Sequence, residues 1–207
     1  MSRRMHKKKH INERMAACSD FFIDDAAQIP ECITTHESHL EIGCGKGQFI
    51  CEMARNHKNI VFFAIEREPN VILISAERAR NMALSNVKFI KTDIREALEF
   101  PLIHKFSRIY INFCDPWPKT RHAGRRLTHL GYLSRYKNLL CENGEIWFKT
   151  DSKPLFEFSV KNFQAAGYTP FFMTEDLHNS DSYENVMTEY ETLFSNMGQP
   201  IYSIKAR

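Results

Sequence analysis

Residues 109–126 carry the side chains best suited to chemistry, in the order IYINFCDPWPKTRHAGRR. The segment begins as an apolar run typical of a buried strand and breaks at Asp115-Pro116-Trp117-Pro118. An acid and an aromatic at the carboxyl end of a strand predict the floor of a small-molecule pocket, since open α/β sheets bind ligands there. The cationic positions that follow are Lys119, Arg121, His122, Arg125 and Arg126. This glycine-containing loop predicts a phosphate-facing surface, so the segment predicts a small pocket that opens onto a polyanion.

A glycine-rich turn supplies a second group of such positions. Residues 40–47 read LEIGCGKG, an apolar strand that runs into Gly43, Gly45 and Gly47. Glycine tolerates positive φ and lets a ligand approach the backbone closely. The dinucleotide fingerprint would need its third glycine at position 48, which is Gln48 in this chain.

Glu41 lies two residues before this GxGxG turn, an arrangement that resembles the first motif of class I S-adenosylmethionine-dependent methyltransferases. The sulfonium and ammonium of that cofactor favour a carboxylate, whereas a dinucleotide places its pyrophosphate on a helix amino terminus. Glu66 is expected to contact the ribose hydroxyls, and Asp93 to lie at the adenine edge. Taken singly, each acid is as well explained by a helix cap or a turn. Together with Asp115 they end four successive candidate strands, and this convergence predicts a cofactor pocket.

Strand-like and helix-like segments alternate along the chain, which predicts an α/β fold with a parallel, doubly wound sheet. The expected strands are residues 39–42, 60–65, 87–90, 109–113, 145–149 and 168–173, with 190–194 and 201–204 as further extended candidates. Helices are expected after each of the first five strands, the fourth of them over residues 130–140. Residues 1–207 are expected to form one domain, with residues 1–20 as a basic arm that either reaches a polyanion or is simply disordered.

Composition limits the class of protein. Hydrophobic residues make up 43% and charged residues 26%, with a net charge of +3, as in ordinary globular proteins. Charge is unevenly distributed: residues 116–140 contain no acid, whereas residues 175–191 are rich in acids. The six cysteines form no CxxC pair, and neither a signal peptide nor a membrane span is evident, so a reduced cytoplasmic setting is expected. The HESH run at residues 36–39 lacks the HExxH spacing, so no metal is expected.

The order Asp-Pro-Trp-Pro distinguishes two kinds of methyltransferase. Amino-methylating enzymes that act on adenine use (N/D)PP(Y/F/W), with adjacent prolines before the aromatic. Residues 112–119, NFCDPWPK, with the basic loop after them, instead resemble the bacterial tRNA (guanine-N7-)-methyltransferases. The resemblance continues in FKTD at 148–151, MTEYE at 187–191 and GQPIY at 198–202, and it covers the chain from about residue 40 to the end.

The resemblance implies a Rossmann-like class I fold: a mostly parallel seven-stranded sheet with an antiparallel C-terminal strand. It implies S-adenosylmethionine as cofactor, tRNA as partner, and 7-methylguanosine at guanine 46 of the variable loop as product. No obligate protein partner is implied, and relatives vary between monomer and homodimer. The implied cofactor contacts are Glu41, Gly43, Gly45, Gly47, Glu66, Asp93 and Asp115. The implied substrate contacts are Lys119, Asp151, Thr188 and Glu191, and the implied RNA contacts are Arg121, His122, Arg125 and Arg126.

Guanine N7 already carries a lone pair, so its methylation needs no general base. Asp115, as the catalytic residue, is therefore expected to position the guanine and stabilise its developing charge. Trp117 either stacks on a base or packs in the core. Gly124 gives the basic loop freedom to move. The loop is therefore expected to be disordered in the free protein and to become ordered only on tRNA. The alternatives are an amino-group methyltransferase acting on nucleic acid or protein, and a non-catalytic RNA-binding module.

Overall fold

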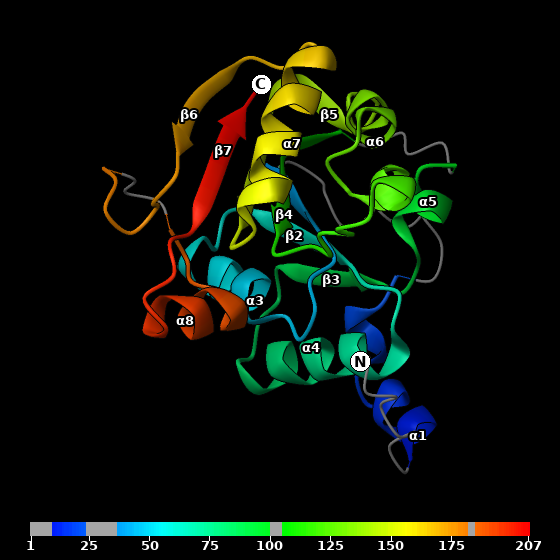
Figure 1. Cartoon of the computed structure of the whole chain (residues 1–207). Coiled ribbons are helices and arrows are strands. Elements are labelled where there is room, and N and C mark those ends of the chain that lie inside the picture. The colour runs from blue at the N-terminus through cyan, green and yellow to red at the C-terminus, as the bar shows by residue number, and fades with distance from the viewer. Residues whose placement is uncertain (1–9, 24–36, 100–104, 182–184) are drawn as a thin grey trace.

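The computed structural model describes residues 10–23, 37–99, 105–181 and 185–207. Its centre is a seven-stranded sheet in the order β3-β2-β1-β4-β5-β7-β6 (Figure 1). The strands are β1 Ser38–Ile42, β2 Val61–Ile65, β3 Val87–Ile90, β4 Phe106–Asn112, β5 Leu140–Thr150, β6 Pro170–Thr174 and β7 Tyr202–Ala206. The first five pair in parallel, and β7 runs antiparallel to both β5 and β6. The predicted sheet, mostly parallel with an antiparallel C-terminal strand, is confirmed.

Helices cover both faces of the sheet, with α3, α4 and α8 on one side and α5, α6 and α7 on the other (Figure 1). Their bounds are α1 Ile11–Ala16, α3 Gln48–Asn56, α4 Pro69–Asn81, α5 Ile94–Ala97, α6 Leu130–Tyr136, α7 Lys153–Ala165 and α8 Glu189–Asn196, with 3-10 helices η1 Ser19–Phe21 and η3 Thr120–Arg125. One hydrophobic cluster lies on each face. Strand β2 reads VFFAI and is almost wholly buried, as expected for a strand covered on both sides.

Successive side chains of β1 and β4 point alternately to the two faces of the sheet, and this alternation decides which of them lie on the face that carries α3. In β4, Ile109 and Ile111 belong to the cluster under α6 and α7, so Tyr110 and Asn112 lie on the α3 face. In β1, Leu40 and Ile42 belong to that same cluster, which places Glu41 on the α3 face. Glu41 and Asn112 therefore meet on the face that also carries the glycine turn.

The prediction of an extended segment at residues 190–194 is wrong, because these residues lie in α8. Helix α8 begins with a capping box: Thr188 Oγ1 accepts from the Glu191 amide at 2.9 Å, and Glu191 Oε2 accepts from the Thr188 amide at 3.4 Å. Thr-x-x-Glu is the sequence signature of this cap. The β-branched and aromatic side chains of the segment favour a strand, but the capping box at its start stabilises a helix.

Two further boundaries differ from the predictions. Helix α6 ends at Tyr136, and β5 already starts at Leu140, so the fifth strand is longer at its amino end than expected. Asn143 adopts a left-handed φ of 61° inside β5 and so accommodates Asn-Gly without ending the strand. The basic loop, expected to be disordered without tRNA, forms the 3-10 helix η3.

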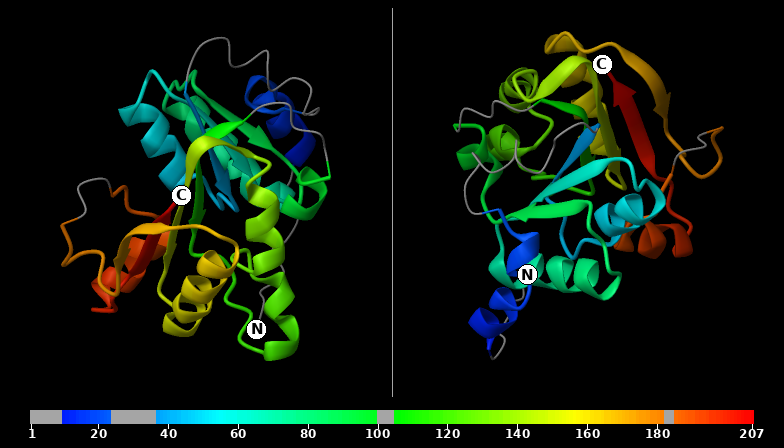
Figure 2. Two further views of the ribbon diagram at one scale, coloured as in Figure 1. Left: turned by 90° about the horizontal axis from the view of Figure 1, so that it is seen from above. Right: turned by 180° about the vertical axis from the view of Figure 1, so that it is seen from behind.

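The amino-terminal arm is described from residue 10 onward. Helix α1 lies beside α4 in both views of Figure 2, and the Arg14 guanidinium donates to both carboxylate oxygens of Glu77 at 2.7 and 2.6 Å. The arm's residues 1–9, and His36 of the HESH run, lie outside the described residues. Among the described helices, none has both the length and the apolar character needed to cross a bilayer.

Candidate active site

The glycine turn follows β1 and leads into α3. Gly43, Gly45 and Gly47 all have positive φ, at 77°, 57° and 75°. A Cβ on Gly47 would lie 2.7 Å from the Cβ of Ser75, so α3 and α4 could not approach as closely with any other residue there. The Ser75 hydroxyl donates to the Gly45 carbonyl at 2.7 Å and fixes the middle of the turn. The turn is therefore held rigidly at the carboxyl end of β1.

Glu41 is a buried carboxyl group beside this turn, with only 2% of its surface exposed. Its Oε1 accepts from Asn112 Nδ2 at 2.9 Å, whereas its Oε2 has no partner among the described residues. Burial raises the pKa of Glu41 to about 7. A buried carboxylate oxygen without a donor is costly, so the site suits a ligand that brings positive charge or N–H groups.

Glu66 and Asp93 follow β2 and β3 at the same edge of the sheet. Glu66 Oε2 accepts from the Gly45 amide at 3.2 Å, and its Oε1 accepts from the Glu68 amide at 3.0 Å, so Glu66 is oriented against the glycine turn. Asp93 caps α5 and forms a bidentate pair with Arg95 at 3.0 Å. The hydrogen bonds from Arg95 lower the pKa of Asp93 to about 2. Asp93 thus serves as a helix cap, and its adenine contact stays a prediction.

Asp115 lies exposed in the loop after β4. The flanking residues Phe113 and Trp117 both have left-handed φ, at 49° and 41°. The Arg126 guanidinium donates to the carbonyls of Pro116 and Trp117, each at 3.0 Å, and lies over the Phe158 ring at 4.3 Å. Strained non-glycine residues persist only where the surroundings hold them. Arg126 is therefore a brace for the turn that presents Asp115.

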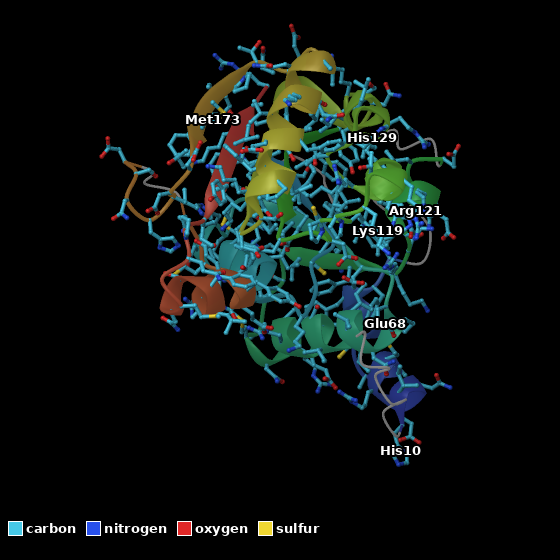
Figure 3. All side chains as sticks on the ribbon, viewed as in Figure 1. His10, Glu68, Lys119, Arg121, His129 and Met173 are labelled. Carbon is cyan, nitrogen blue, oxygen red and sulfur yellow. The ribbon has the colours of Figure 1, made fainter. Side chains whose placement is uncertain are left out.

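The remaining basic positions form an open surface. Lys119, Arg121 and Arg125 are exposed, and Figure 3 shows Lys119 and Arg121 at the surface on the opposite side of the view from Met173 of β6. Trp117 is half-buried and packs within its own loop, with the His122 ring at 5.7 Å and the Arg125 guanidinium at 4.9 Å. Trp117 belongs to neither hydrophobic cluster, so the alternative in which it packs in the core is wrong.

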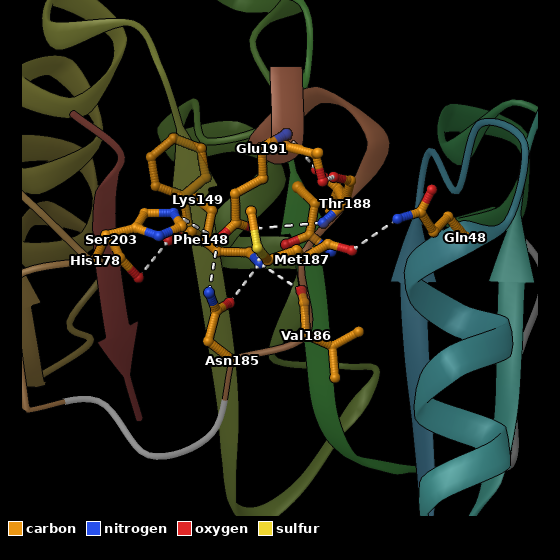
Figure 4. Close-up of polar contacts among 12 residues, drawn as sticks. Gln48, Phe148, Lys149, His178, Asn185, Val186, Met187, Thr188, Glu191 and Ser203 are labelled. Atoms are coloured by element: carbon orange, nitrogen blue, oxygen red, sulfur yellow. Dashed lines mark hydrogen bonds and ion pairs between the residues drawn. The ribbon is translucent and has the colours of Figure 1, made fainter. Parts of the chain in front are cut away.

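Lys149, in β5, is a residue that the sequence analysis missed. It is buried, and its Nζ donates to Glu191 Oε2 at 2.6 Å, Asn185 Oδ1 at 2.9 Å and the Val186 carbonyl at 3.0 Å (Figure 4). Burial lowers the pKa of Lys149, and the charge of Glu191 opposes that shift. The only sequence signal is a lysine at the end of an otherwise apolar strand. Its partner is 42 residues further along the chain.

The predicted substrate contacts divide into two groups. Lys119 is exposed and Asp151 is half-buried, so both have surface that a ligand could reach. Thr188 and Glu191 are buried in the capping box and the ion pair with Lys149. In the described structure these two residues hold α8 in place.

Helix α8 is also tied to the glycine turn, which brings the segments of the site together. Gln48 Nε2 donates to the Met187 carbonyl at 3.3 Å (Figure 4), and Glu189 pairs with Lys46 at 3.4 Å and with Arg78 at 2.7 Å. The structure thus places the glycine turn, the ends of β1 to β4 and the amino terminus of α8 around one edge of the sheet.

A cavity of about 490 Å³ lies on the α3 face of the sheet. Its lining reaches the site at Asn112 and Lys149 and contains none of the four strand-end acids. Glu66, Asp93 and Asp115 therefore lie outside this cavity, and Glu41 is buried against its lining residue Asn112.

Comparison with known proteins agrees with this geometry. The family model described as "Putative methyltransferase" matches residues 35–204. A tRNA (guanine-N(7)-)-methyltransferase of Clostridium botulinum (strain Loch Maree / Type A3) is 40% identical over 99% of both chains. One of Brevibacillus brevis is 46% identical over 81% of this chain and 79% of its own. Among solved structures, the 16S rRNA methyltransferase KamB has a TM-score of 0.67 at 12% identity, over 89% of this chain and 94% of that one, which shows a shared class I methyltransferase fold. By these matches over most of its length, the chain belongs to the tRNA (guanine-N(7)-)-methyltransferase family.

Proposed function

We propose that this protein transfers a methyl group from S-adenosylmethionine to N7 of guanine 46 in the variable loop of tRNA. One observation carries the proposal: a buried carboxylate with an unpartnered oxygen, Glu41, shares a sheet edge with the exposed Asp115, which leads directly into a cationic loop. This arrangement suits a small cationic cofactor and a polyanionic substrate on adjoining surfaces. The names of the relatives support the same reaction.

The residues present fit the cofactor. Glu41 would accept hydrogen bonds from its ammonium, the turn from Gly43 to Gly47 would lie against its methionine part, and Glu66 would accept from the ribose hydroxyls. Asp93 would border the adenine. When bound, S-adenosylmethionine supplies a methyl group on a positively charged sulfur. The chain's own contribution is to orient the acceptor, an effect that can supply roughly 7–11 kcal/mol in well-aligned reactions.

Asp115 would be the catalytic residue. Its carboxylate makes no hydrogen bond or ion pair to any other described residue, so it can accept hydrogen bonds from guanine N1–H and the amino group. Methylation of N7 leaves positive charge on the ring, which a nearby carboxylate stabilises. Lys119 and Asp151 would contact the substrate directly, and Thr188 and Glu191 would act through the position of α8.

Cofactor affinity should depend on the ionisation of Glu41. Because its pKa is about 7, the carboxylate that attracts a cationic ligand forms as pH rises, and the dissociation constant should fall between about pH 6 and 7.5. Glu41→Gln should weaken binding about 10- to 100-fold, the cost of a lost charged hydrogen bond. Isothermal titration calorimetry measures both. The amine of S-adenosylmethionine titrates in the same way with the wild type and with Glu41→Gln. An identical pH dependence of the dissociation constant in these two proteins would therefore contradict the role of the Glu41 carboxylate.

Substitutions in the basic loop should distinguish residues that contact RNA from Arg126, which holds the turn that presents Asp115. Arg121→Ala should lower tRNA affinity and reduce the slope of log affinity against log salt by about one, because one phosphate contact is lost. Arg126→Ala should mainly lower turnover, since the carbonyls of Pro116 and Trp117 lose their donor. Fluorescence anisotropy over a KCl series checks the slope, and an unchanged slope for Arg121→Ala would contradict its assignment.

The direct test of the function is labelled methyl transfer from S-adenosylmethionine to bulk tRNA, followed by nucleoside analysis. We expect 7-methylguanosine, and we expect none from a transcript in which guanine 46 is replaced by adenine. Methyladenosine would favour an amino-group methyltransferase, and no transfer would favour a non-catalytic RNA-binding module. We further propose a cytoplasmic location, which the free thiols of the five described cysteines support.

A further inference from the structure

Three aromatic rings lie together where the loop after β4 meets α8. The ring centroids of Phe113, Tyr190 and Phe194 are 6.4, 6.2 and 6.3 Å apart in the three pairs, and their planes lie within 24° of one another. Tyr190 is 59% exposed, and the other two rings are half-buried. We infer that this aromatic cluster is the surface on which the target guanine stacks, with Tyr190 as its accessible ring. The inference rests on the proposed function.

The geometry of the cluster leaves ring faces open. Aromatic pairs in proteins have centroids roughly 4.5–7 Å apart, so these three near-parallel rings are at the long end of that range. In a column of three rings stacked face to face, neighbouring centroids would be closer than these, and the two outer centroids would be about twice as far apart. Three nearly equal centroid distances exclude such a column. The rings are therefore slipped sideways relative to one another. Together they present a broad apolar surface, and a purine has a flat face of matching character.

The position of the cluster matches what the reaction requires. Phe113 is two residues before Asp115, and its amide donates to the Lys149 carbonyl at 2.9 Å, which fixes its strained backbone at the strand end. On the other side, Tyr190 directly follows Glu189, which pairs with Lys46 of the glycine turn. The cluster thus joins the loop that presents Asp115 to the helix that contacts the glycine turn. A guanine that receives a methyl group from the proposed cofactor pocket and contacts Asp115 must come close to both segments.

Packing of α8 does not by itself account for the exposed tyrosine. The helix is already held by the buried Lys149–Glu191 pair, its capping box, and the contacts of Glu189 with Lys46 and Arg78. A large ring that is 59% exposed adds little to that anchoring. An enzyme that takes a base out of its stack must offset the lost stacking, and aromatic side chains in base-flipping proteins do so.

The test compares Tyr190→Leu, which removes the aromatic face, with Tyr190→Phe, which keeps it. Phe171→Leu is the matched control, because Phe171 is a 46% exposed aromatic on the edge strand β6. Each variant is assayed for KM with tRNA, for the dissociation constant of S-adenosylmethionine and for Tm. A tRNA with 2-aminopurine in place of guanine 46 reports stacking directly, since stacking quenches its fluorescence.

We expect Tyr190→Leu to raise the tRNA KM about tenfold, as for loss of a stacking contact, with cofactor affinity and Tm close to the wild type. The 2-aminopurine fluorescence should stay low on binding to the wild type, Tyr190→Phe and Phe171→Leu, and rise with Tyr190→Leu. A rise on binding to the wild type overturns the inference without any variant, as does an unchanged KM in Tyr190→Leu. If the wild type forms 7-methylguanosine, such a result refutes the stacking surface alone. A wild type that forms none refutes both the function and the surface.

Discussion

Asp115→Asn is expected to lower the single-turnover rate of methyl transfer by roughly 10²–10³-fold, the usual cost of removing one preorganised electrostatic contact from an active site. The asparagine keeps the size of the side chain and one carbonyl oxygen. It loses the negative charge that we propose stabilises the guanine as the ring becomes positive. Stopped or quenched single-turnover assays at saturating tRNA separate this effect from binding.

The same substitution should leave cofactor affinity within about threefold of the wild type, because Glu41 and not Asp115 offers the buried acceptor oxygen at the glycine turn. Asp93→Asn is the matched control, because Asp93, which caps α5 and pairs with Arg95, is proposed to border the adenine of the cofactor and not the guanine. It should affect cofactor affinity and not the rate of the chemical step. An Asp115→Asn enzyme that turns over at the wild-type rate would contradict the assignment.

No proton leaves N7 during the reaction, so the single-turnover rate should show a solvent isotope effect close to one. A large effect would indicate that Asp115 acts as a general base, as it would in an amino-group methyltransferase. This measurement distinguishes the two mechanisms even if the loss of rate in Asp115→Asn is as large as expected.

The parts of the site that could be predicted from sequence are the local ones. The glycine turn and the acids Glu41, Glu66 and Asp93 follow strands whose apolar runs are clear, and parallel pairing brings those strand ends together without further information. The direction of β7 entered only through the resemblance to a known family. Its sequence alone is compatible with either direction, since the pairing partner β5 lies some fifty residues earlier.

What could not be predicted depends on partners distant in sequence. Arg126 is one of several similar cations in its loop, and only the folded turn shows that it binds the carbonyls of Pro116 and Trp117. Among the described residues, the hydrogen-bond partners of the Lys149 ammonium are all at least 36 positions away in the chain. Thr188 and Glu191 have the spacing of a capping box, and this local structural role accounts for the burial of both side chains without a substrate.

The Lys149–Glu191 pair should dominate the stability of this edge of the sheet. Both side chains are buried, at 7% and 0% exposure, and removing one partner of a buried pair leaves an uncompensated charge. Glu191→Gln is therefore expected to lower the free energy of unfolding by about 3–5 kcal/mol. For a domain of this size that corresponds to a fall in Tm of roughly 10 °C. Thermal and urea unfolding measure it.

Glutamine at position 191 keeps one acceptor oxygen, which can still accept from the Thr188 amide and complete the capping box, but its NH2 group takes the place of the oxygen that accepts from Asn185 Nδ2, so the substitution removes the charge together with that hydrogen bond. Lys149→Met combined with Glu191→Gln should recover much of the loss, because the stranded ammonium is gone.

The deficit of Glu191→Gln should also shrink as pH rises. Burial already lowers the pKa of Lys149, and without Glu191 it falls further, so the folded state releases a proton that the unfolded state keeps and stability rises with pH. If Glu191→Gln instead unfolds like the wild type and raises only the KM for tRNA, Glu191 contacts the substrate directly. If stability and the KM for tRNA both change, α8 carries substrate contacts whose position depends on the buried Lys149–Glu191 pair. The double variant Lys149→Met with Glu191→Gln should then restore both stability and the KM for tRNA.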